Sequence, residues 1–220
     1  MRRPAGESDA MTRDRRILIA ALVVSLVLLV AGGLWLTLRP VGDRFAGCRQ
    51  GVIVDGTAAL GGPFRLTDET GAPVTDAEVF ARPGLLYFGY TFCPDICPAD
   101  NARNAVATDI LRERGYDIRP VMITVDPKRD TPGVLRDFTD AMHPDMLGLT
   151  GTPEEIAAVN KLWRNYYRSQ DDGSDPYYLV DHMTNTFLVL PGAGTVEFFG
   201  RDVTPEAMAD RAACFLDAAA

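Results

Sequence analysis

The sequence is 220 residues long, 47% hydrophobic and 24% charged, with a formal net charge of −8. This length and composition suit one globular domain with a sizeable core plus an additional segment, and they exclude a chain that is disordered throughout. Five Arg and three acidic residues precede the first apolar run, and the remainder holds 17 basic against 27 acidic residues, about −10. We therefore expect no nucleic-acid binding, which requires a basic patch to contact phosphates.

The first predicted element is a transmembrane helix over residues 17–38. This stretch has no charged residue, and at about 1.5 Å per residue it reaches roughly 33 Å, enough to cross a bilayer core. Arg13, Arg15 and Arg16 crowd its N-terminal side, so the positive-inside rule predicts that residues 1–16 are cytoplasmic. We expect a single-pass anchor in the inner (cytoplasmic) membrane, with the following domain in the periplasm.

Two alternatives compete with an uncleaved anchor. A cleaved signal peptide has an apolar region of about 7–15 residues followed by a small-x-small site, whereas this run is longer and ends in Leu-Arg-Pro. A lipoprotein signal is suggested by the sequence F-A-G-C, which ends at Cys48. Charged residues separate Cys48 from the apolar run, and a lipobox normally adjoins that run. We therefore favour the uncleaved anchor.

Residues 39–62 are rich in Gly and lack periodicity, which predicts a linker and lead-in to a domain over residues 63–220. Within the domain, short apolar runs predict strands, whereas helical spacing with capping residues predicts helices. Strands are expected at 64–67, 74–79, 85–90, 118–125, 146–149, 185–190 and 195–199, and helices over 98–114, from 131 to about 143, from 152 and from 204. A βαβ half followed by a ββα half predicts an α/β fold, with a mixed sheet flanked by helices.

The chemistry concentrates in the sequence T-F-C-P-D-I-C-P over residues 91–98. Cys93 and Cys97 follow a buried strand and begin a helix, where the helix dipole favours the thiolate that binds metals and attacks disulfides. Residues four apart on a helix have Cβ atoms about 5–6 Å apart, whereas a disulfide needs about 3.5–4.5 Å. A bridge would require a distorted first turn, so the spacing favours metal binding over dithiol redox chemistry without excluding either.

The sequence contains two histidines, and His182 is the candidate third ligand. It ends the sequence L-V-D-H, in a loop just before the strand expected at 185–190. In a thioredoxin-like sheet this loop faces the cysteine turn. Soft thiolates select Cu(I), zinc or iron–sulfur clusters, and structural zinc requires four ligands, so two cysteines and one histidine favour Cu(I). His143 has no comparable context and is expected to be structural.

Two further cysteines lie outside this motif. Cys48 follows the start of the lead-in, and Cys214 lies in the last predicted helix. A location outside the cytoplasm permits disulfides, and a bridge between them would tie the lead-in to the end of the domain. The alternative is two separate free thiols.

Three motifs in this order closely resemble those of the Sco/SenC family. They are Y-F-G-Y-T-F-C-P-D-I-C-P over residues 87–98, I-T-V-D-P-K-R-D-T-P over residues 123–132, and L-V-D-H over residues 179–182. The resemblance covers roughly residues 60–200. It implies a thioredoxin-like fold behind an N-terminal membrane anchor, and a role in assembling the binuclear copper centre of cytochrome c oxidase. It also implies that Cys93, Cys97 and His182 bind both Cu(I) and Cu(II).

Other residues are interpreted from their place in these motifs. Asp126 and Asp130 are expected to shape the rim of the site and to support the ligands from behind. Met183 departs from the family, in which a small hydroxyl residue commonly follows the histidine. Its thioether sulfur is chemically able to contact copper, but packing is the more common role of a methionine.

The resemblance predicts a membrane-anchored copper metallochaperone. Its expected partners are the copper-bearing subunit of cytochrome c oxidase and, as a further candidate, another copper carrier. The alternative is a thiol-disulfide oxidoreductase that uses Cys93 and Cys97 to reduce the cysteines of the oxidase copper site, or to sense redox state. The two roles are compatible, because a bare dithiol can exchange and a copper-bound one cannot. A peroxiredoxin-type peroxidase shares the fold but needs neither a second cysteine four residues on nor a facing histidine.

Overall fold

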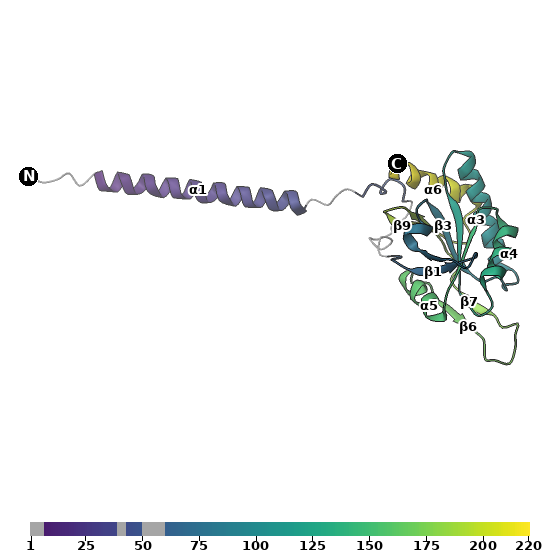
Figure 1. The fold of residues 1–220 in the computed structure, drawn as a ribbon. Coiled ribbons are helices and arrows are strands. Elements are labelled where there is room, and N and C mark those ends of the chain that lie inside the picture. Colours follow the sequence, from purple (N-terminus) through teal and green to yellow (C-terminus); the bar gives the residue numbers. More distant parts are fainter. Residues whose placement is uncertain (1–6, 39–42, 50–59) are drawn as a thin grey trace, which may run out of the picture. The chain divides into compact units, whose positions relative to one another are not determined.

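The computed structural model describes residues 7–38, 43–49 and 60–220, and the chain divides into two units at Asp43 (Figure 1). The first unit contains helix α1 (Glu7–Leu38). Its segment Leu18–Trp35 carries no charged residue, and α1 is the one helix in the described part of the chain that is long and apolar enough to cross a membrane. The helix therefore fits a membrane anchor.

The second unit is built on a seven-stranded mixed sheet. Its strands follow the order β2-β1-β5-β4-β3-β8-β9, in which β3, β4 and β5 are parallel and the remaining neighbours pair antiparallel. The strands are β1 (Arg65–Asp68), β2 (Pro73–Thr75), β3 (Gly84–Gly89), β4 (Arg119–Thr124), β5 (Leu147–Thr150), β8 (Thr186–Leu190) and β9 (Gly194–Phe199). The central strand β3 is buried along its whole length, as its unbroken apolar sequence predicts.

Within the described residues, five helices accompany the sheet: α2 (Asp76–Val79), α3 (Ile96–Glu113), α4 (Pro132–Met142), α5 (Pro153–Leu162) and α6 (Pro205–Ala219). Three of them begin in the same way, with a Thr that caps the helix and a Pro in its first turn. The caps are Thr131, Thr152 and Thr204. Gly115 follows α3 with a φ of 95°, a conformation that favours glycine and ends the helix.

The sheet separates two hydrophobic cores, and strand β8 shows how. Phe187 and Val189 contribute to one core, whereas Leu188 and Leu190 contribute to the other, because alternate residues of a strand point to opposite faces. Residues of α4 and α5 complete the first core. Residues of α3 and α6 complete the second. These layers confirm the thioredoxin-like α/β fold expected from the sequence.

Three short elements differ from the predicted pattern. The run expected as a strand over 74–79 divides into β2 and the single turn α2, because Thr75 and Glu78 form a capping box that begins a helix. Strands β6 (Tyr167–Ser169) and β7 (Val180–His182) form a separate two-stranded sheet that the sequence does not predict. His182 is consequently the last residue of a strand rather than part of a loop.

A disulfide joins Cys48 to Cys214 in α6. Phe45 and Cys48 are buried in the same core as Phe215, and the rings of Phe45 and Phe215 lie 5.7 Å apart. This part of the expected linker is therefore packed against the domain, while residues 39–42 and 50–59 of it lie outside the described residues. A cysteine in a disulfide cannot carry a lipoprotein's thioether, so this bond favours the uncleaved anchor over the lipobox alternative.

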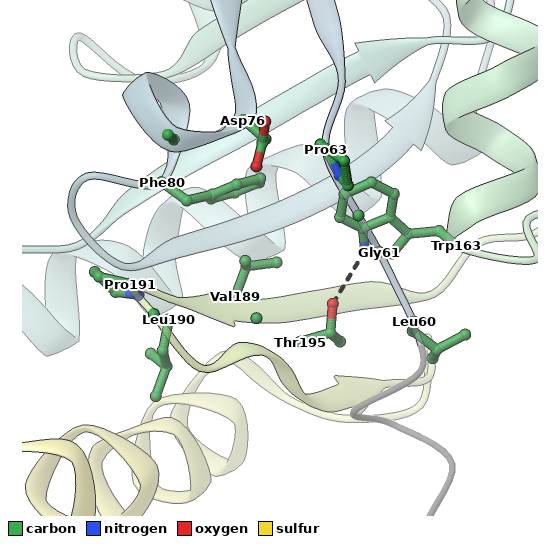
Figure 2. Close-up of a pocket in the computed structure, with 14 residues that line it drawn as sticks. Leu60, Gly61, Pro63, Asp76, Phe80, Trp163, Val189, Leu190, Pro191 and Thr195 are labelled. Carbon is green, nitrogen blue, oxygen red and sulfur yellow. Dashed lines mark hydrogen bonds between the residues drawn. The ribbon is translucent and has the colours of Figure 1, made fainter.

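A pocket of about 410 Å³ lies at the amino end of β3, where Gly84 pairs with Val189 (Figure 2). Phe80 and Trp163 form its apolar walls, and the Trp163 indole N–H donates a hydrogen bond to Thr195 Oγ1 (3.2 Å). The pocket has a single titratable side chain among its described lining residues, an aspartate whose carboxylate accepts a backbone N–H. The groups suited to chemistry lie instead at the carboxyl end of β3.

Candidate metal centre

The cysteines lie where the chain passes from β3 into α3. Cys93 lies in the turn between these elements and is half-buried, whereas Cys97 is the second residue of α3 and is fully buried. The side chain of Asp95 does not cap the helix. Instead, Cys93 Sγ accepts the backbone N–H of Cys97 at 3.3 Å. A sulfur atom therefore occupies the position of a capping oxygen, where the positive end of the helix favours a thiolate.

Gly89, the last residue of β3, makes room for Cys97. A Cβ atom at this position would lie 2.6 Å from a ring carbon of Tyr87 and 3.2 Å from Cys97 Sγ. Glycine thus allows the buried thiol to lie directly against the strand. From the other side, the Asn101 side chain donates a hydrogen bond to the Cys97 carbonyl (2.9 Å) and secures the first turn of α3.

His182 approaches the cysteines from the end of β7. Its Nε2 lies 3.3 Å from Cys97 Sγ, and its Nδ1 lies 2.8 Å from the Met183 carbonyl oxygen. A carbonyl only accepts hydrogen bonds, so Nδ1 carries the proton in the neutral ring and the lone pair of Nε2 faces the cysteines. The rings of Tyr87 and Tyr90 meet the imidazole edge-to-face at 6.0 and 5.8 Å and hold its orientation.

The two thiols differ in acidity. A hydrogen bond from the Cys97 thiol lowers the pKa of Cys93, with further lowering from backbone N–H groups, against the effect of burial. The same interaction with Cys93, together with burial, raises the pKa of Cys97. The first proton therefore leaves the half-exposed Cys93, while the buried Cys97 keeps its proton.

The structure brings together all three ligands expected from the sequence. Their donor atoms, two sulfurs and one imidazole nitrogen, all lie within 4.8 Å of one another. Soft sulfur donors with one nitrogen suit Cu(I), whereas structural zinc would require a fourth ligand. A pocket of about 320 Å³ opens beside Cys93 and His182 and leaves one side of the donor set accessible.

Asp130 supports the cysteine turn without joining the donor set. It is fully buried, and it accepts hydrogen bonds from the backbone N–H (3.1 Å) and hydroxyl (2.6 Å) of Thr91 and from the hydroxyl of Thr124 (2.6 Å). Burial raises its pKa, while these hydrogen bonds oppose the rise. Asp130 thus connects the end of β4 to the beginning of the cysteine turn.

Asp126 belongs to a second group of residues that supports the cysteine turn. The sequence identifies Asp126 but not its partners. Its carboxylate accepts a hydrogen bond from the Tyr178 hydroxyl (2.9 Å) and forms an ion pair with Arg129. The Arg129 guanidinium lies 3.6 Å from the ring centroid of Tyr178 and 4.7 Å from that of Phe92, which precedes Cys93. Arg129 stands within the D-P-K-R-D motif, and this is the one sequence signal for its role.

The remaining residues considered from the sequence lie outside the donor set. Met183 is 40% exposed, and its backbone N–H donates to the Tyr166 carbonyl (3.0 Å). His143 is buried at the end of α4, with Nε2 3.2 Å from an Asp109 oxygen and Nδ1 accepting the backbone N–H of Asp145 (3.0 Å). Both ring nitrogens of His143 thus have local partners, as expected of a structural histidine.

Comparison with known proteins places the chain among its relatives. The family model described as SCO1/SenC matches residues 54–217. Protein SenC of Rhodobacter capsulatus is 56% identical over 176 residues, which are 80% of this chain and 79% of that protein.

Two solved structures share the fold and were determined with copper bound. Arabidopsis thaliana ScoI is 38% identical with a TM-score of 0.68, covering 72% of this chain and 99% of that chain. Bradyrhizobium japonicum ScoI is 34% identical with a TM-score of 0.63, covering 70% and 98%. The matched region contains both cysteines, His182 and the sheet that positions them. By its sequence, its thioredoxin-like fold and these relatives, the chain belongs to the SCO1/SenC family.

Proposed function

We propose that this protein carries copper on Cys93, Cys97 and His182 and assists the assembly of the binuclear copper centre of cytochrome c oxidase. One observation carries the proposal: two thiol sulfurs and an imidazole nitrogen lie within 4.8 Å of one another beside an open pocket. The copper-bound relatives from Arabidopsis thaliana and Bradyrhizobium japonicum support copper as the cargo.

The donor set suits both oxidation states of copper. Two thiolates and one imidazole provide the soft, low-coordinate environment that Cu(I) prefers, and imidazole is also a good ligand for Cu(II). Because Nδ1 of His182 donates to a backbone carbonyl, Nε2 remains directed toward the metal position. Cys93 and His182 line the pocket and Cys97 lies behind them, so a partner's ligands reach the cargo from the pocket side.

The anchor would hold this site where the oxidase copper centre is built. We propose that α1 crosses the inner membrane once, with Arg13, Arg15 and Arg16 in the cytoplasm and the second unit in the periplasm. The proposed recipient is the copper-bearing subunit of the oxidase. Another copper carrier is the proposed source of the cargo.

Copper titration tests the proposal. The detergent-solubilised full chain is titrated with Cu(I) against a chelator of known affinity, as wild type and as Cys93→Ser, Cys97→Ser and His182→Ala. We expect wild type to retain one equivalent and each variant to lose at least about 100-fold in affinity, because loss of a partner that only orients a ligand already costs up to about 100-fold and each variant lacks a donor itself. Wild-type protein that retains no copper, or variants that match it, would contradict the proposal.

A second candidate function, thiol-disulfide reduction of the oxidase copper site, is favoured by the unequal acidity of the two thiols. The Cys93 thiolate would attack a partner disulfide and release one partner thiol. Cys97 would then attack the mixed disulfide, leaving a Cys93–Cys97 disulfide and two reduced partner cysteines. A Cys97→Ser variant should then trap the partner on Cys93. A reduction potential below about −300 mV, with no trapped partner, would instead make the pair inert in exchange.

A further inference from the structure

Exposed apolar side chains gather around the metal centre. In residues 43–49 and 60–220, eight large apolar side chains are exposed, and five of them lie in the cysteine turn or in the segment that leads through β6 and β7 to just beyond His182. We call these five the apolar rim: Phe92, Tyr166, Tyr177, Leu179 and Met183. The other three are Val106 on α3, Val134 on α4 and Phe198 on β9, one to each element.

Contacts join the rim residues to the site and to one another. The rings of Phe92 and Tyr177 lie 5.9 Å apart, although 70% of Tyr177 is exposed. Leu179 lines the pocket with Cys93 and His182. Single exposed apolar residues are ordinary, whereas a cluster rich in aromatic residues and methionine beside an open site is typical of a protein interface.

The surroundings of the rim are acidic. Residues 165–184 contain four Asp and one Arg, and Asp95 adds a carboxylate at the pocket. The single Arg of this segment, Arg168, pairs in register with Asp181 across β6 and β7. Two basic residues from outside the segment are offset by ion pairs, Lys128 with Asp171 and Arg129 with Asp126. Asp172 and Asp175 form no ion pair with any described residue, so their charges face solvent. The rim thus combines an apolar centre with a negative border.

This combination selects among possible occupants. Anionic lipid headgroups and a second copy of this chain would both present negative charge to the negative border, which is unfavourable. A protein with Lys and Arg around an apolar patch would complement both features. Leu179 lines the pocket with Cys93 and His182, and Phe92 and Met183 are the chain neighbours of these two ligands. A partner docked on the rim would therefore bring its own copper ligands to the pocket.

We propose that the apolar rim and its aspartates are the docking surface for a partner that presents its copper ligands within an apolar patch bordered by basic residues. The inference rests on the proposed function and adds to it the chemistry of the partner's surface. Apolar contacts would slow dissociation, whereas charge would speed encounter, so association should weaken as salt rises.

The first experiment replaces rim residues that do not touch the donor set. The probe is the soluble copper-binding domain of an oxidase subunit from the same organism. Its binding to the detergent-solubilised full chain is measured without copper, and Cu(I) transfer is followed by stopped flow. We expect Tyr166→Ser/Tyr177→Ser to weaken binding and slow transfer at least tenfold, with unchanged copper affinity. The matched control Val106→Ser/Phe198→Ser, which removes exposed apolar residues elsewhere, should change neither.

The second experiment reverses charge on the border. Asp172→Lys/Asp175→Lys should weaken binding at low salt and flatten its salt dependence, whereas the control Asp137→Lys/Asp140→Lys on α4 should do neither.

Rim and control variants that behave alike would overturn the inference. So would lower copper affinity in the rim variants, tighter binding of wild type to phosphatidylglycerol vesicles than to the probe, or self-association through the rim. Failure of wild type to bind copper would count against the proposed function alone. The docking surface would still be tested by the binding measured without copper.

Discussion

Cys93 and Cys97 lie four residues apart but have different chemical roles. Cys93 is half-exposed, caps α3 through its sulfur and has a lowered pKa, whereas Cys97 is buried and has a raised pKa. The sequence predicts both as ligands from their spacing and their place after a buried strand. It does not predict this division of acidity, because the division depends on a hydrogen bond between the two side chains and on the depth of Cys97.

Alkylation measures this difference directly. An ordinary cysteine has a pKa of about 8.5, so its reaction rate falls tenfold for each pH unit below that value. Because folding lowers the pKa of Cys93, we expect its rate with iodoacetamide to stay nearly constant from pH 8 to pH 6, while Cys97 does not react in the folded protein. Mass spectrometry of the labelled peptides gives both rates. In Cys97→Ala the hydrogen-bond donor is lost, and the rate at Cys93 should again fall as pH falls.

Gly89 also acts at the residue scale. In Gly89→Ala the new methyl group would overlap the ring of Tyr87 and press on Cys97 Sγ. We expect a loss of about 1–3 kcal/mol in the free energy of unfolding and weaker copper binding, measured by urea denaturation and by competition with a chelator. Gly133→Ala is the matched control, because a Cβ there meets nothing within 4 Å and alanine favours a helix. Equal stability of the two variants would contradict this account.

At the scale of elements, the sequence predicts the long, strongly patterned segments and misses the short ones. Strands β3 and β8 and helices α4 to α6 follow from apolar runs and from Thr-Pro capping signals. Strands β6 and β7 have only three residues each and are separated by a polar loop. Three residues are too few to show the alternation of apolar and polar side chains that predicts a strand. His182 is expected opposite the cysteines, and the β6–β7 pairing, which the sequence does not predict, is part of what holds it there.

Arg129 connects three elements around the site. Its guanidinium joins the cysteine turn at Phe92 to the approach to β7 at Tyr178, and it pairs with the buried Asp126. Removing it leaves the Asp126 charge buried without its cation. We expect Arg129→Leu to lower the free energy of unfolding by roughly 3 kcal/mol and to alter the Cu(II)-thiolate absorption spectrum.

The neighbouring Lys128 provides the control for this experiment. Its ion pair with Asp171 lies on the surface, where such pairs contribute little. Lys128→Leu should therefore leave both stability and spectrum unchanged. An Arg129→Leu protein with wild-type stability and an unchanged spectrum would show that the connection is dispensable.

At the scale of the whole molecule, the disulfide ties the lead-in to the last helix. Cys48 and Cys214 are 166 residues apart in sequence, so the bond closes a very long loop. In the chain-entropy view a loop of this length removes much of the freedom of the unfolded state, which corresponds to about 2–5 kcal/mol of stability. From the sequence, a disulfide between these two cysteines is one of two alternatives. Their packing with Phe45 in one core shows how the fold brings them together.

Replacing both cysteines tests this contribution. We expect Cys48→Ser/Cys214→Ser to unfold at a markedly lower urea concentration than wild type, with copper affinity unchanged because Cys93 and Cys97 are untouched. Reduction of wild type with a strong thiol should reproduce the shift and have no effect on the double variant. A double variant as stable as wild type would show that packing alone holds the lead-in.

The proposed function depends on copper binding by two sulfurs and one imidazole nitrogen at the carboxyl end of β3. X-ray absorption of the Cu(I)-loaded full chain counts those donors directly. We expect two sulfur neighbours at about 2.3 Å and one nitrogen neighbour at about 2.0 Å, by analogy with zinc. His182→Ala should lose the nitrogen and keep both sulfurs. A nitrogen neighbour that persists in His182→Ala, or a wild-type spectrum without two sulfurs, would contradict the proposed function.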